Sequence, residues 1–414
     1  MKRTEGFYRA DEYKLIKFNT MKILLVNDYG VPLGGAEVYI LRLRKLLRDK
    51  GHDARLFTSN VAADGQVNEA DYTCVGTTSP FRAALQTMNP WAYLKLGKVI
   101  KEFKPDVVHV KIFLTQLSPL ILPLLRDIPS IYHVAWYRPI CPTGTKLLPD
   151  GNLCNVKPGI TCRQNKCLPS GDWAALMLQL KLFRRWRGAF NTILANSESV
   201  RDKLVSYGID NAEVLDYCIP ESGTDVHLSE TPTVAFAGRL VREKGADILL
   251  RAFANVLKFI PAARLLIAGE GTESEKLRGL ISDLNMSPNV SMLGSIPSSH
   301  LDSHLSEAWV QAVPSVWEEP FGMAAAEAMM RGTAVIASDT GGLREIIDNG
   351  KSGLLVPPGD VEELTVKLTR LLGDKSLAQS IGRAGHMSAS SRFSADKHLE
   401  KLMIIYESLC ARHS

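Results

Sequence analysis

Short apolar runs alternate with amphipathic segments along the chain from Met21 onward. In the second half, runs of four or five mostly aliphatic residues are separated by stretches of 3.6-residue periodicity such as Ala246–Phe259 and Glu275–Leu284. The short runs are apolar at nearly every position, which is typical of strands buried on both faces of a parallel sheet. The strands predicted here are Val234–Ala237, Arg264–Ala268, Val290–Leu293, Val310–Pro314, Ala334–Ala337 and Gly353–Val356.

The first half repeats the pattern, with helices predicted at Ala36–Lys50 and Ala92–Phe103. We therefore predict an α/β protein of two doubly wound, Rossmann-like domains whose sheets face each other across a cleft. The domains span residues 21–225 and 226–396, joined near the polar stretch Pro220–Thr233. An extension, 1–20, precedes them, and a helix at 397–414 follows, with packing back on the N-terminal domain as one option. The strands predicted in the first half are Ile23–Val26, Arg55–Thr58, Val107–Val110, Ile131–Val134 and Thr192–Ala195.

Composition narrows the class of protein. Hydrophobic residues make up 45% and charged residues 22% of the 414 positions, as in ordinary globular proteins. A net charge of +5 over this length is too weak to indicate a nucleic-acid binder. No apolar run approaches the length of a membrane-spanning helix, and the first 20 residues lack the apolar centre of a secretion signal. We expect a cytoplasmic protein.

Two glycine-containing loops follow predicted strands. Gly34-Gly35 comes after the first strand and opens a helix, where free backbone amides favour an anion. GRLVREKG, Gly238–Gly245, places Arg239 and Lys244 on one loop, and two such cations suit a diphosphate. A tight turn and a solvated basic turn are the alternative interpretations of the two motifs.

The segment EEPFGMAAAEAMMRG, residues 318–332, carries Glu319 and Glu327 on either side of the N-terminus of a helix predicted to begin near Gly322. Two carboxylates beside a helix N-terminus would repel an anion. They make sense if each accepts hydrogen bonds from the hydroxyls of a sugar while amides and cations hold a phosphate. An ordinary acidic loop would account for Glu327 but not for the EPFG sequence.

These motifs, with the diglycine of Ser338–Ile346 and the later SGLLVPPGD, resemble the family 4 glycosyltransferases in order and spacing over Val234–Pro358. The resemblance implies the GT-B fold and transfer of a sugar, with retention, from a nucleotide-sugar to a hydroxyl of a saccharide or polyprenyl-linked acceptor. It also implies cell-envelope or exopolysaccharide synthesis and no cofactor for catalysis. A non-catalytic nucleotide-sugar-binding subunit and a GT-B epimerase or phosphorylase are the alternatives.

The resemblance also assigns roles to single residues. Arg239 and Lys244, with Gly238 beside them, would bind the diphosphate and stabilise its charge, and His133 would lie near the anomeric carbon. Glu319 would contact the hydroxyls of the sugar, and Glu327 would hold the ribose. His109 matches a family position, whereas Lys111 stands where relatives often carry a second histidine. The remaining donor-binding positions are Gly34, Gly35, Leu293, Gly294 and the backbone of Phe321, Gly322 and Met323.

Two further segments carry candidate chemistry. Four thiols within an irregular, Cys-rich insertion at 141–167 are enough for one structural Zn²⁺, although their spacings of 13, 8 and 5 residues match no CxxC knuckle. Disulfides or free thiols are the alternatives. The segment Asp172–Phe190 predicts a helix that combines aromatic residues with cations, which suits either an anionic membrane surface or a helix covering the sheet. The thiols are Cys141, Cys154, Cys162 and Cys167, the aromatic residues Trp173, Phe183 and Trp186, and the cations Lys181, Arg184, Arg185 and Arg187.

Overall fold

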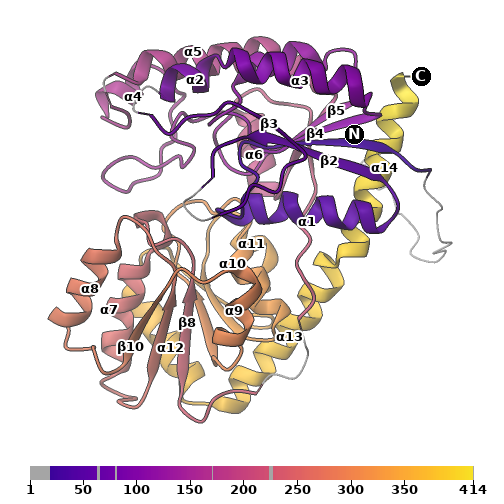
Figure 1. The fold of residues 1–414 in the computed structure, drawn as a ribbon. Helices are drawn as coiled ribbons and strands as arrows, with labels where there is room; N and C mark the ends of the chain where they lie inside the picture. Colours follow the sequence, from indigo (N-terminus) through magenta and orange to yellow (C-terminus); the bar gives the residue numbers. More distant parts are fainter. Residues whose placement is uncertain (1–18, 63–65, 80–81, 170, 223–226, 414) are drawn as a thin grey trace, which may run out of the picture.

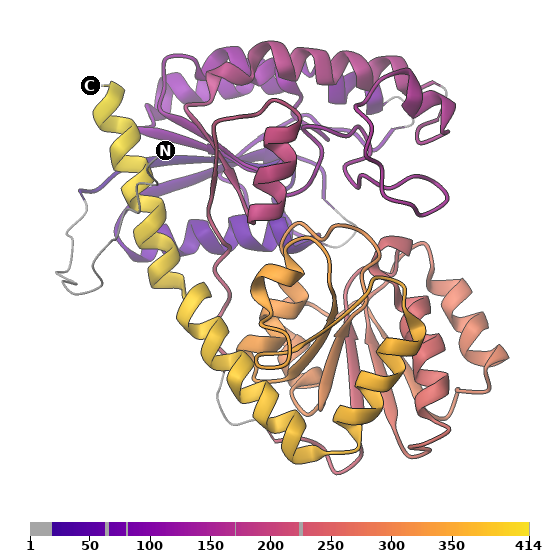
Figure 2. The ribbon, with the colours of Figure 1, turned by 180° about the vertical axis from the view of Figure 1, so that it is seen from behind.

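A computed structural model describes residues 19–62, 66–79, 82–169, 171–222 and 227–413, so that most of the predicted extension 1–20 lies outside the described residues. The chain forms two α/β domains, one above the other in Figures 1 and 2. Every strand pairing in both sheets is parallel. The predicted α/β class with two doubly wound sheets is confirmed.

The N-terminal sheet has the strand order β3-β2-β1-β4-β5-β6-β7. The short edge strands β3 and β7 were not predicted, because three residues with partly exposed positions give no apolar run. The strands are β1 (Lys22–Val26), β2 (Asp53–Ser59), β3 (Tyr72–Cys74), β4 (Val107–Val110), β5 (Ser130–His133), β6 (Thr192–Ala195) and β7 (Ala212–Val214). The helices are α1 (Gly35–Asp49), α2 (Arg82–Thr87), α3 (Pro90–Phe103), η1 (Pro119–Leu125), α4 (Ile160–Gln164), α5 (Trp173–Trp186), η2 (Arg187–Ala189) and α6 (Glu198–Ser206).

The C-terminal sheet repeats this topology in the order β10-β9-β8-β11-β12-β13. Its strands are β8 (Thr233–Ala237), β9 (Arg264–Ala268), β10 (Val290–Gly294), β11 (Val310–Val313), β12 (Ala334–Ser338) and β13 (Leu354–Val356). The helices are η3 (Arg242–Lys244), α7 (Ala246–Val256), α8 (Ser274–Asp283), α9 (Ser298–Leu305), α10 (Met323–Met330), α11 (Leu343–Ile346), α12 (Val361–Leu372), α13 (Lys375–Phe393) and α14 (Ala395–His413).

The direction in which successive strands are added reverses once in each sheet, between β1 and β4 and between β8 and β11. In open α/β sheets, ligands bind beyond the carboxyl ends of the strands at this point. The loops after β1, β8 and β11 carry the predicted residues Gly35, Lys244 and Glu319. The topology therefore gathers motifs that lie far apart in the sequence.

The last helix returns to the N-terminal domain. In both views α14 leaves the C-terminal domain and runs along the other one (Figures 1 and 2). Leu402, Met403 and Tyr406 share one buried cluster with residues of α1. The crossing point is fixed by a hydrogen bond of 2.9 Å from the Ile219 amide to the Phe393 carbonyl. Among the described residues, no helix combines the length and the apolar character needed to cross a bilayer.

His398 is the polar centre of the contact between α14 and the N-terminal domain. Its Nδ1 lies 2.7 Å from the Asp216 carbonyl oxygen, which can only accept, so Nδ1 carries the proton. Nε2 must then accept from the Tyr39 hydroxyl at 2.9 Å. The neutral ring satisfies both bonds. Burial lowers the pKa of His398 to about 4.

This pKa predicts acid sensitivity of the folded chain. A histidine in the unfolded chain takes up a proton near pH 6.5, whereas His398 in the folded chain does so only near pH 4, so stability is lost as the pH falls through this window. The whole loss is about 3 kcal/mol. Urea unfolding at several pH values should show a shallower dependence for His398→Gln than for the wild type. The exposed His304→Gln should behave like the wild type, and identical profiles for all three proteins would contradict the assignment.

Candidate active site

Three helices that face the cleft begin without a side-chain cap. The residues before α1, α7 and α10 are Gly34, Gly245 and Gly322, and none of the three helices has a side chain bonded to its first amides. Helices α12 and α13 instead begin at Asp360 and Asp374, whose carboxylates cap them. Uncapped amides at the positive end of a helix are available to an anion.

The starts of α1 and α10 come from different domains and meet in the cleft. A Cβ atom on Gly35 would lie 3.1 Å from Cγ of Met323, the first residue of α10. Gly322 precedes it with φ +108°, a conformation that favours glycine. The predicted donor-binding glycines therefore allow the two helix N-termini to approach each other from opposite sides.

Glu319 lies in the loop before α10 and is surrounded by donors. The Lys244 ammonium contacts both carboxylate oxygens, at 2.7 and 2.9 Å. The Ser315 hydroxyl and the Trp317 indole N–H donate to Oε2 at 2.9 and 2.8 Å. Burial alone raises the pKa of Glu319, but Lys244 and the two hydrogen bonds more than offset this and hold the pKa below its ordinary value. The carboxylate is therefore charged, and Oε1 has Lys244 as its one hydrogen-bond donor among the described residues.

The diglycine of the TGG motif supports this loop from behind. The Gly342 amide donates to the Glu319 carbonyl at 2.7 Å. A Cβ on Gly342 would lie 2.6 Å from the Phe321 carbonyl oxygen, and one on Gly341 would collide with the Glu319 backbone. The motif therefore serves close backbone packing. The Phe321 ring is buried and packs against Tyr217 and Phe393, which tie the loop to both interdomain connections.

The two predicted cations of the GRLVREKG loop differ in their surroundings. The Lys244 side chain is 20% exposed and paired with Glu319. The Arg239 side chain is 59% exposed, and its nearest acid is Glu243 at 3.6 Å. Lys244 is thus part of a largely buried pair, whereas the Arg239 guanidinium lies in a mostly exposed one.

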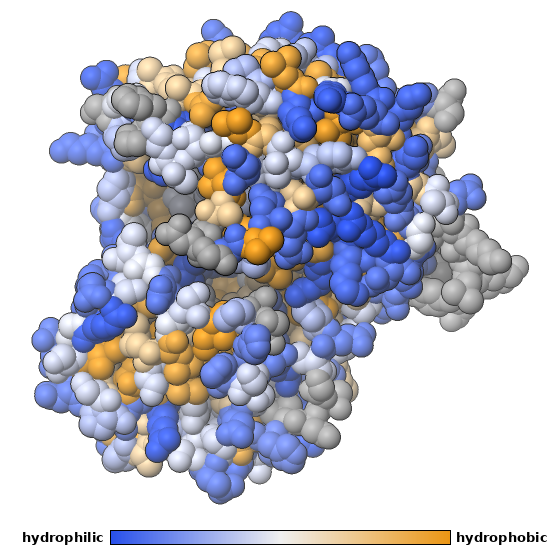
Figure 3. Space-filling model, in the orientation of Figure 1, coloured by the Kyte–Doolittle hydropathy of each residue, from blue (hydrophilic) through white to orange (hydrophobic). Residues whose placement is uncertain are grey.

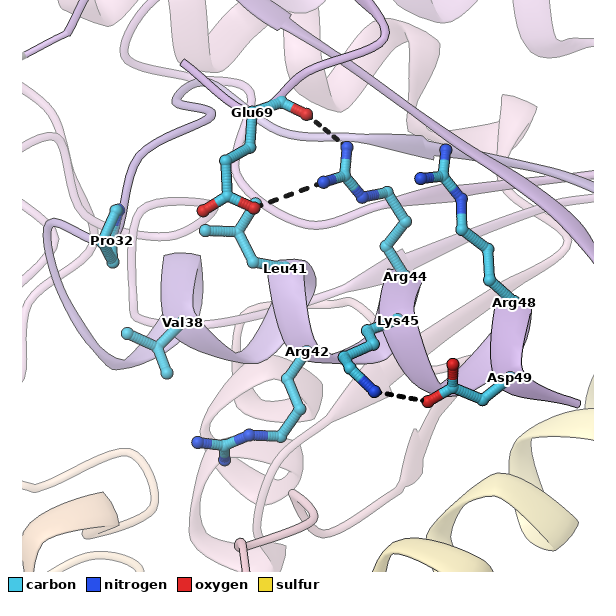
Figure 4. A pocket seen from close by; sticks show the side chains of 9 residues that line it. All are labelled: Pro32, Val38, Leu41, Arg42, Arg44, Lys45, Arg48, Asp49 and Glu69. Carbon is cyan, nitrogen blue, oxygen red and sulfur yellow. Dashed lines mark hydrogen bonds and ion pairs between the residues drawn. The ribbon is translucent and has the colours of Figure 1, made fainter. Parts of the chain in front are cut away.

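Glu327 lies one turn into α10 and is half-buried. Burial raises its pKa, and the charges of Arg331 and Arg42 oppose that rise. Arg42 comes from α1 and lines a cavity of about 550 Å³. Figure 4 shows its side chain pointing away from the pairs formed by Arg44 with Glu69 and Lys45 with Asp49. Arg42 was not predicted, although its spacing of seven residues from Gly35 places both on one face of α1.

Contacts from the N-terminal domain fix the loop of Glu319. The Ser197 hydroxyl donates to the Pro320 carbonyl at 2.6 Å, and Lys203 pairs with Glu318 at 2.8 Å. The carboxylate of Glu345 accepts from the first two amides of α6 at 2.8 and 2.7 Å. These contacts give no signal in the sequence because each joins residues more than 100 positions apart.

Three more residues predicted to bind the donor lie at the carboxyl ends of strands. Gly238 follows β8 directly, and its amide donates to the Ala268 carbonyl at 3.0 Å. Leu293 and Gly294 end the outer strand β10, where the Gly269 amide donates to the Gly294 carbonyl at 2.7 Å. Their roles in binding a donor remain predictions.

Family models match both halves of the chain. Residues 33–215 match the model described as Glycosyltransferase Family 4, and residues 225–387 match the model described as Glycosyl transferases group 1. The chain belongs to glycosyltransferase family 4. Over 400 residues it is 27% identical to a phosphatidyl-myo-inositol mannosyltransferase of Mycolicibacterium smegmatis, covering 94% of each chain.

Two other relatives are more similar over shorter stretches. The glycosyltransferase is 37% identical over 181 residues to an exopolysaccharide phosphotransferase of Streptomyces coelicolor, covering 44% of this chain and 19% of the relative. It is 37% identical over 186 residues to a D-inositol 3-phosphate glycosyltransferase of Corynebacterium jeikeium, covering 43% of this chain and 44% of the relative. The chain thus spans less than half the length of these two relatives.

Solved structures share the fold. A sucrose-phosphate synthase from Thermosynechococcus elongatus has a TM-score of 0.72 at 21% identity, covering 94% of this chain and 99% of that one. Anabaena HepE in complex with UDP and glucose has a TM-score of 0.68 at 20% identity, covering 94% and 100%. The fold of this glycosyltransferase is therefore GT-B, as predicted.

His133 is the last residue of β5. Its side chain is fully buried, and the ring contacts Tyr39, His109 and Tyr217. His133 ends β5 on the face covered by α1 and α14, and its role near the anomeric carbon stays a prediction. Neither ring nitrogen has a hydrogen-bond partner among the described residues, and burial lowers the pKa of the ring. Lys111 lies in the same cluster, with its amine 4.2 Å from the Tyr217 ring.

The four cysteines of the insertion share one neighbourhood without forming a recognisable metal centre. The thiols of Cys141, Cys154 and Cys162 each contribute to raising the pKa of Cys167, after burial. Within the described part of the chain, however, no three Cys, His, Asp or Glu side chains are arranged to hold a metal ion, and the cysteines are free thiols. The insertion instead contacts the other domain, since Arg242 donates to the carbonyls of Pro149 and Asp150.

The different surroundings of Lys244 and Arg239 give a test of the site. Lys244→Met leaves the Glu319 carboxylate buried without its counter-charge and should destabilise the chain by about 3 kcal/mol. Arg239→Met removes an exposed charge from the same loop and should cost less than about 1 kcal/mol. Urea unfolding of both variants measures the difference. An equal loss of unfolding free energy in the two variants would show that the Lys244–Glu319 pair does not behave as a buried ion pair.

Proposed function

We propose that this family member is a retaining glycosyltransferase that moves a sugar from a nucleotide-sugar to a hydroxyl of its acceptor. The observation that carries the proposal is the Lys244–Glu319 pair, which lies beside the uncapped N-terminus of α10 and opposite that of α1. A diphosphate placed there meets amides, Lys244 and the exposed Arg239. A sugar attached to this diphosphate would contact Oε1 of Glu319.

The residues of the site suit the bonds that must change. The bond between the anomeric carbon and the phosphate oxygen breaks, and the acceptor oxygen bonds to the same face of that carbon. The proton of the acceptor hydroxyl passes to the departing phosphate. Arg239, Lys244 and the helix amides stabilise the charge that develops on this phosphate, which is usually the largest contribution in such a site. Glu319 orients the sugar by accepting from its hydroxyls at Oε1.

The nucleoside end is assigned to the side of α10 where Glu327 lies. A ribose diol supplies two donors that one carboxylate accepts, and hydrogen bonds to a charged group stabilise binding by about 1.5–3 kcal/mol. Arg42, whose Nη1 is buried without a partner among the described residues, completes this end from the N-terminal domain.

The names of similar proteins support the substrate class. HepE structures were determined with UDP and UDP-glucose, and a relative from Mycobacterium tuberculosis is described as GDP-mannose-dependent. Relatives named for exopolysaccharide and phosphatidylinositol chemistry support an acceptor in cell-envelope synthesis, either a saccharide or a lipid-linked one. We propose that the reaction takes place on the cytoplasmic side, where an acceptor carried on a polyprenyl lipid would be presented by the inner membrane face.

Thermal unfolding in the presence of UDP-, GDP-, ADP- and TDP-sugars should identify the donor, because a ligand that binds the folded state raises the melting temperature.

With that donor, Arg239→Ala should weaken binding by about tenfold or more, since it removes a charged hydrogen bond. Glu319→Gln should lower kcat by roughly 10²-fold while donor binding changes little. If no nucleotide-sugar shifts the melting temperature and no sugar transfer is detected, the proposed function is wrong.

Transfer should also survive chelation. Because Arg239, Lys244 and the helix amides supply the charge that faces the diphosphate, excess EDTA should leave the initial rate of transfer unchanged. The assay follows labelled sugar in the product, with a metal-dependent transferase in parallel to verify the chelator. A rate that vanishes in EDTA and returns only with Mn²⁺ or Mg²⁺ would contradict this prediction.

A further inference from the structure

The outer layer of the N-terminal domain contains α3 and α5, which both pack on η1. In both ribbon views this layer covers the side of the sheet that faces away from the C-terminal domain (Figures 1 and 2). Figure 3 shows apolar and charged side chains interspersed over the upper part of this domain, where the two helices lie. A surface of this composition differs from the wholly polar outer face expected of a crossover helix.

Helix α3 presents apolar residues first and cations afterwards. Trp91 is 50% and Leu94 68% exposed, and Met88, just before the helix, is 49% exposed. Lys95 and Lys98 continue the same stripe at helical spacing. The stripe therefore has an apolar first half and a cationic second half.

Helix α5 repeats this arrangement. Leu178 is 44% exposed, and Lys181, Arg184 and Arg185 follow it on the outer surface. Of the aromatic residues predicted to face a membrane, Phe183 is fully buried, so α5 contributes cations more than aromatic rings. The exposed aromatic ring comes from α3, which the sequence pattern did not single out.

The charges on this layer are mostly unpaired. Lys98 lies 3.6 Å from Glu102, which is the only acidic residue within α3 and α5. No ion pair among the described residues involves the other five cations, Lys95, Lys101, Lys181, Arg184 and Arg185. Such a surface attracts an extended anionic partner.

The apolar ends of the two stripes point toward the cleft. The last turn of α3 leads into β4 and that of α5 into β6, so the first turns lie at the carboxyl edge of the sheet. The insertion meets the same edge, because the Trp173 indole donates to the Gly159 carbonyl at 3.0 Å. Ile160, 54% exposed, follows that contact.

We propose that this α3–α5 face binds the surface of an anionic lipid bilayer. The face consists of the apolar residues Met88, Trp91, Leu94 and Leu178 and the cations Lys95, Lys98, Lys101, Lys181, Arg184 and Arg185. The apolar residues enter the headgroup boundary, and the cations contact lipid phosphates. This orientation turns the rim of the cleft toward the membrane. The inference concerns binding alone and stands independently of the proposed sugar transfer.

Flotation of the full-length protein with vesicles tests the proposal. The protein should float with vesicles of phosphatidylcholine and phosphatidylglycerol at about 0.1 M NaCl. Most of it should dissociate from these vesicles at about 1 M NaCl. Arg184→Glu combined with Arg185→Glu should reduce the partition coefficient by about 25-fold or more, from roughly fivefold per cation. Trp91→Ser combined with Leu94→Ser should reduce it by about tenfold.

Matched variants on the C-terminal domain serve as controls. Phe259→Ser with Met387→Ser removes similarly exposed apolar side chains, and Lys258→Glu with Arg370→Glu reverses two exposed charges. Both should stay within about twofold of the wild type. The proposal is overturned if the wild type does not float with anionic vesicles, floats equally with pure phosphatidylcholine, or loses binding as much in the controls. Binding to an acidic protein but not to vesicles would overturn it too.

Discussion

The buried pair of Lys244 and Glu319 is the interaction on which the cleft depends. A carboxylate enclosed to this degree is tolerated only when opposite charge and hydrogen bonds replace the lost water. Lys244 supplies the charge from the loop after β8, while Ser315 and Trp317 supply bonds from the loop after β11. The pair therefore joins the two loops at the topological reversal of the C-terminal sheet. Oε2 of Glu319 accepts from Lys244, Ser315 and Trp317, whereas Oε1 accepts from Lys244 alone.

The second constraint is that the loop of Glu319 is held from both domains. Ser197 and Lys203 of the N-terminal domain contact Pro320 and Glu318, and Glu345 supplies the cap that the start of α6 needs. The geometry of the Glu319 loop and the relative position of the domains are therefore coupled. Separation of the domains would leave amides of α6 and the ammonium of Lys203 without partners, so the contacts favour the closed arrangement described here.

The sequence predicted strands that are buried on both faces. It did not predict contacts between residues that lie far apart in the chain. Strands such as β8 and β12 were predicted because both faces are covered, which leaves an unbroken apolar run. The three-residue edges β3 and β7 have no such run. Glycine loops and spaced glutamates placed Gly35, Lys244 and Glu319 in the cleft, since parallel strands end at one edge. The pairing of Lys244 with Glu319 could not be predicted, because 75 residues separate them.

Single side chains were harder to predict than elements. The sequence places His133 at the end of a strand, but it does not show that the ring is fully buried against Tyr39. The sequence of the Cys-rich insertion shows how far apart the thiols lie along the chain but not the conformation of the loop. The geometry of a metal site could therefore not be predicted from it. In α5, the aromatic residues and cations share one segment, yet helical periodicity sends Phe183 inward and Arg184 outward.

The path of α14 has a consequence for biosynthesis. Tyr406 bonds to His109 on β4, and Leu402 and Met403 fill the core beside α1, so residues from the very end of the chain complete the first domain. When only the first 220 residues have been synthesised, the part of this sheet face that α14 covers beside α1 is still exposed. These apolar positions are covered only once residues 395–413 of α14 have been synthesised, so they stay exposed throughout translation of the second domain.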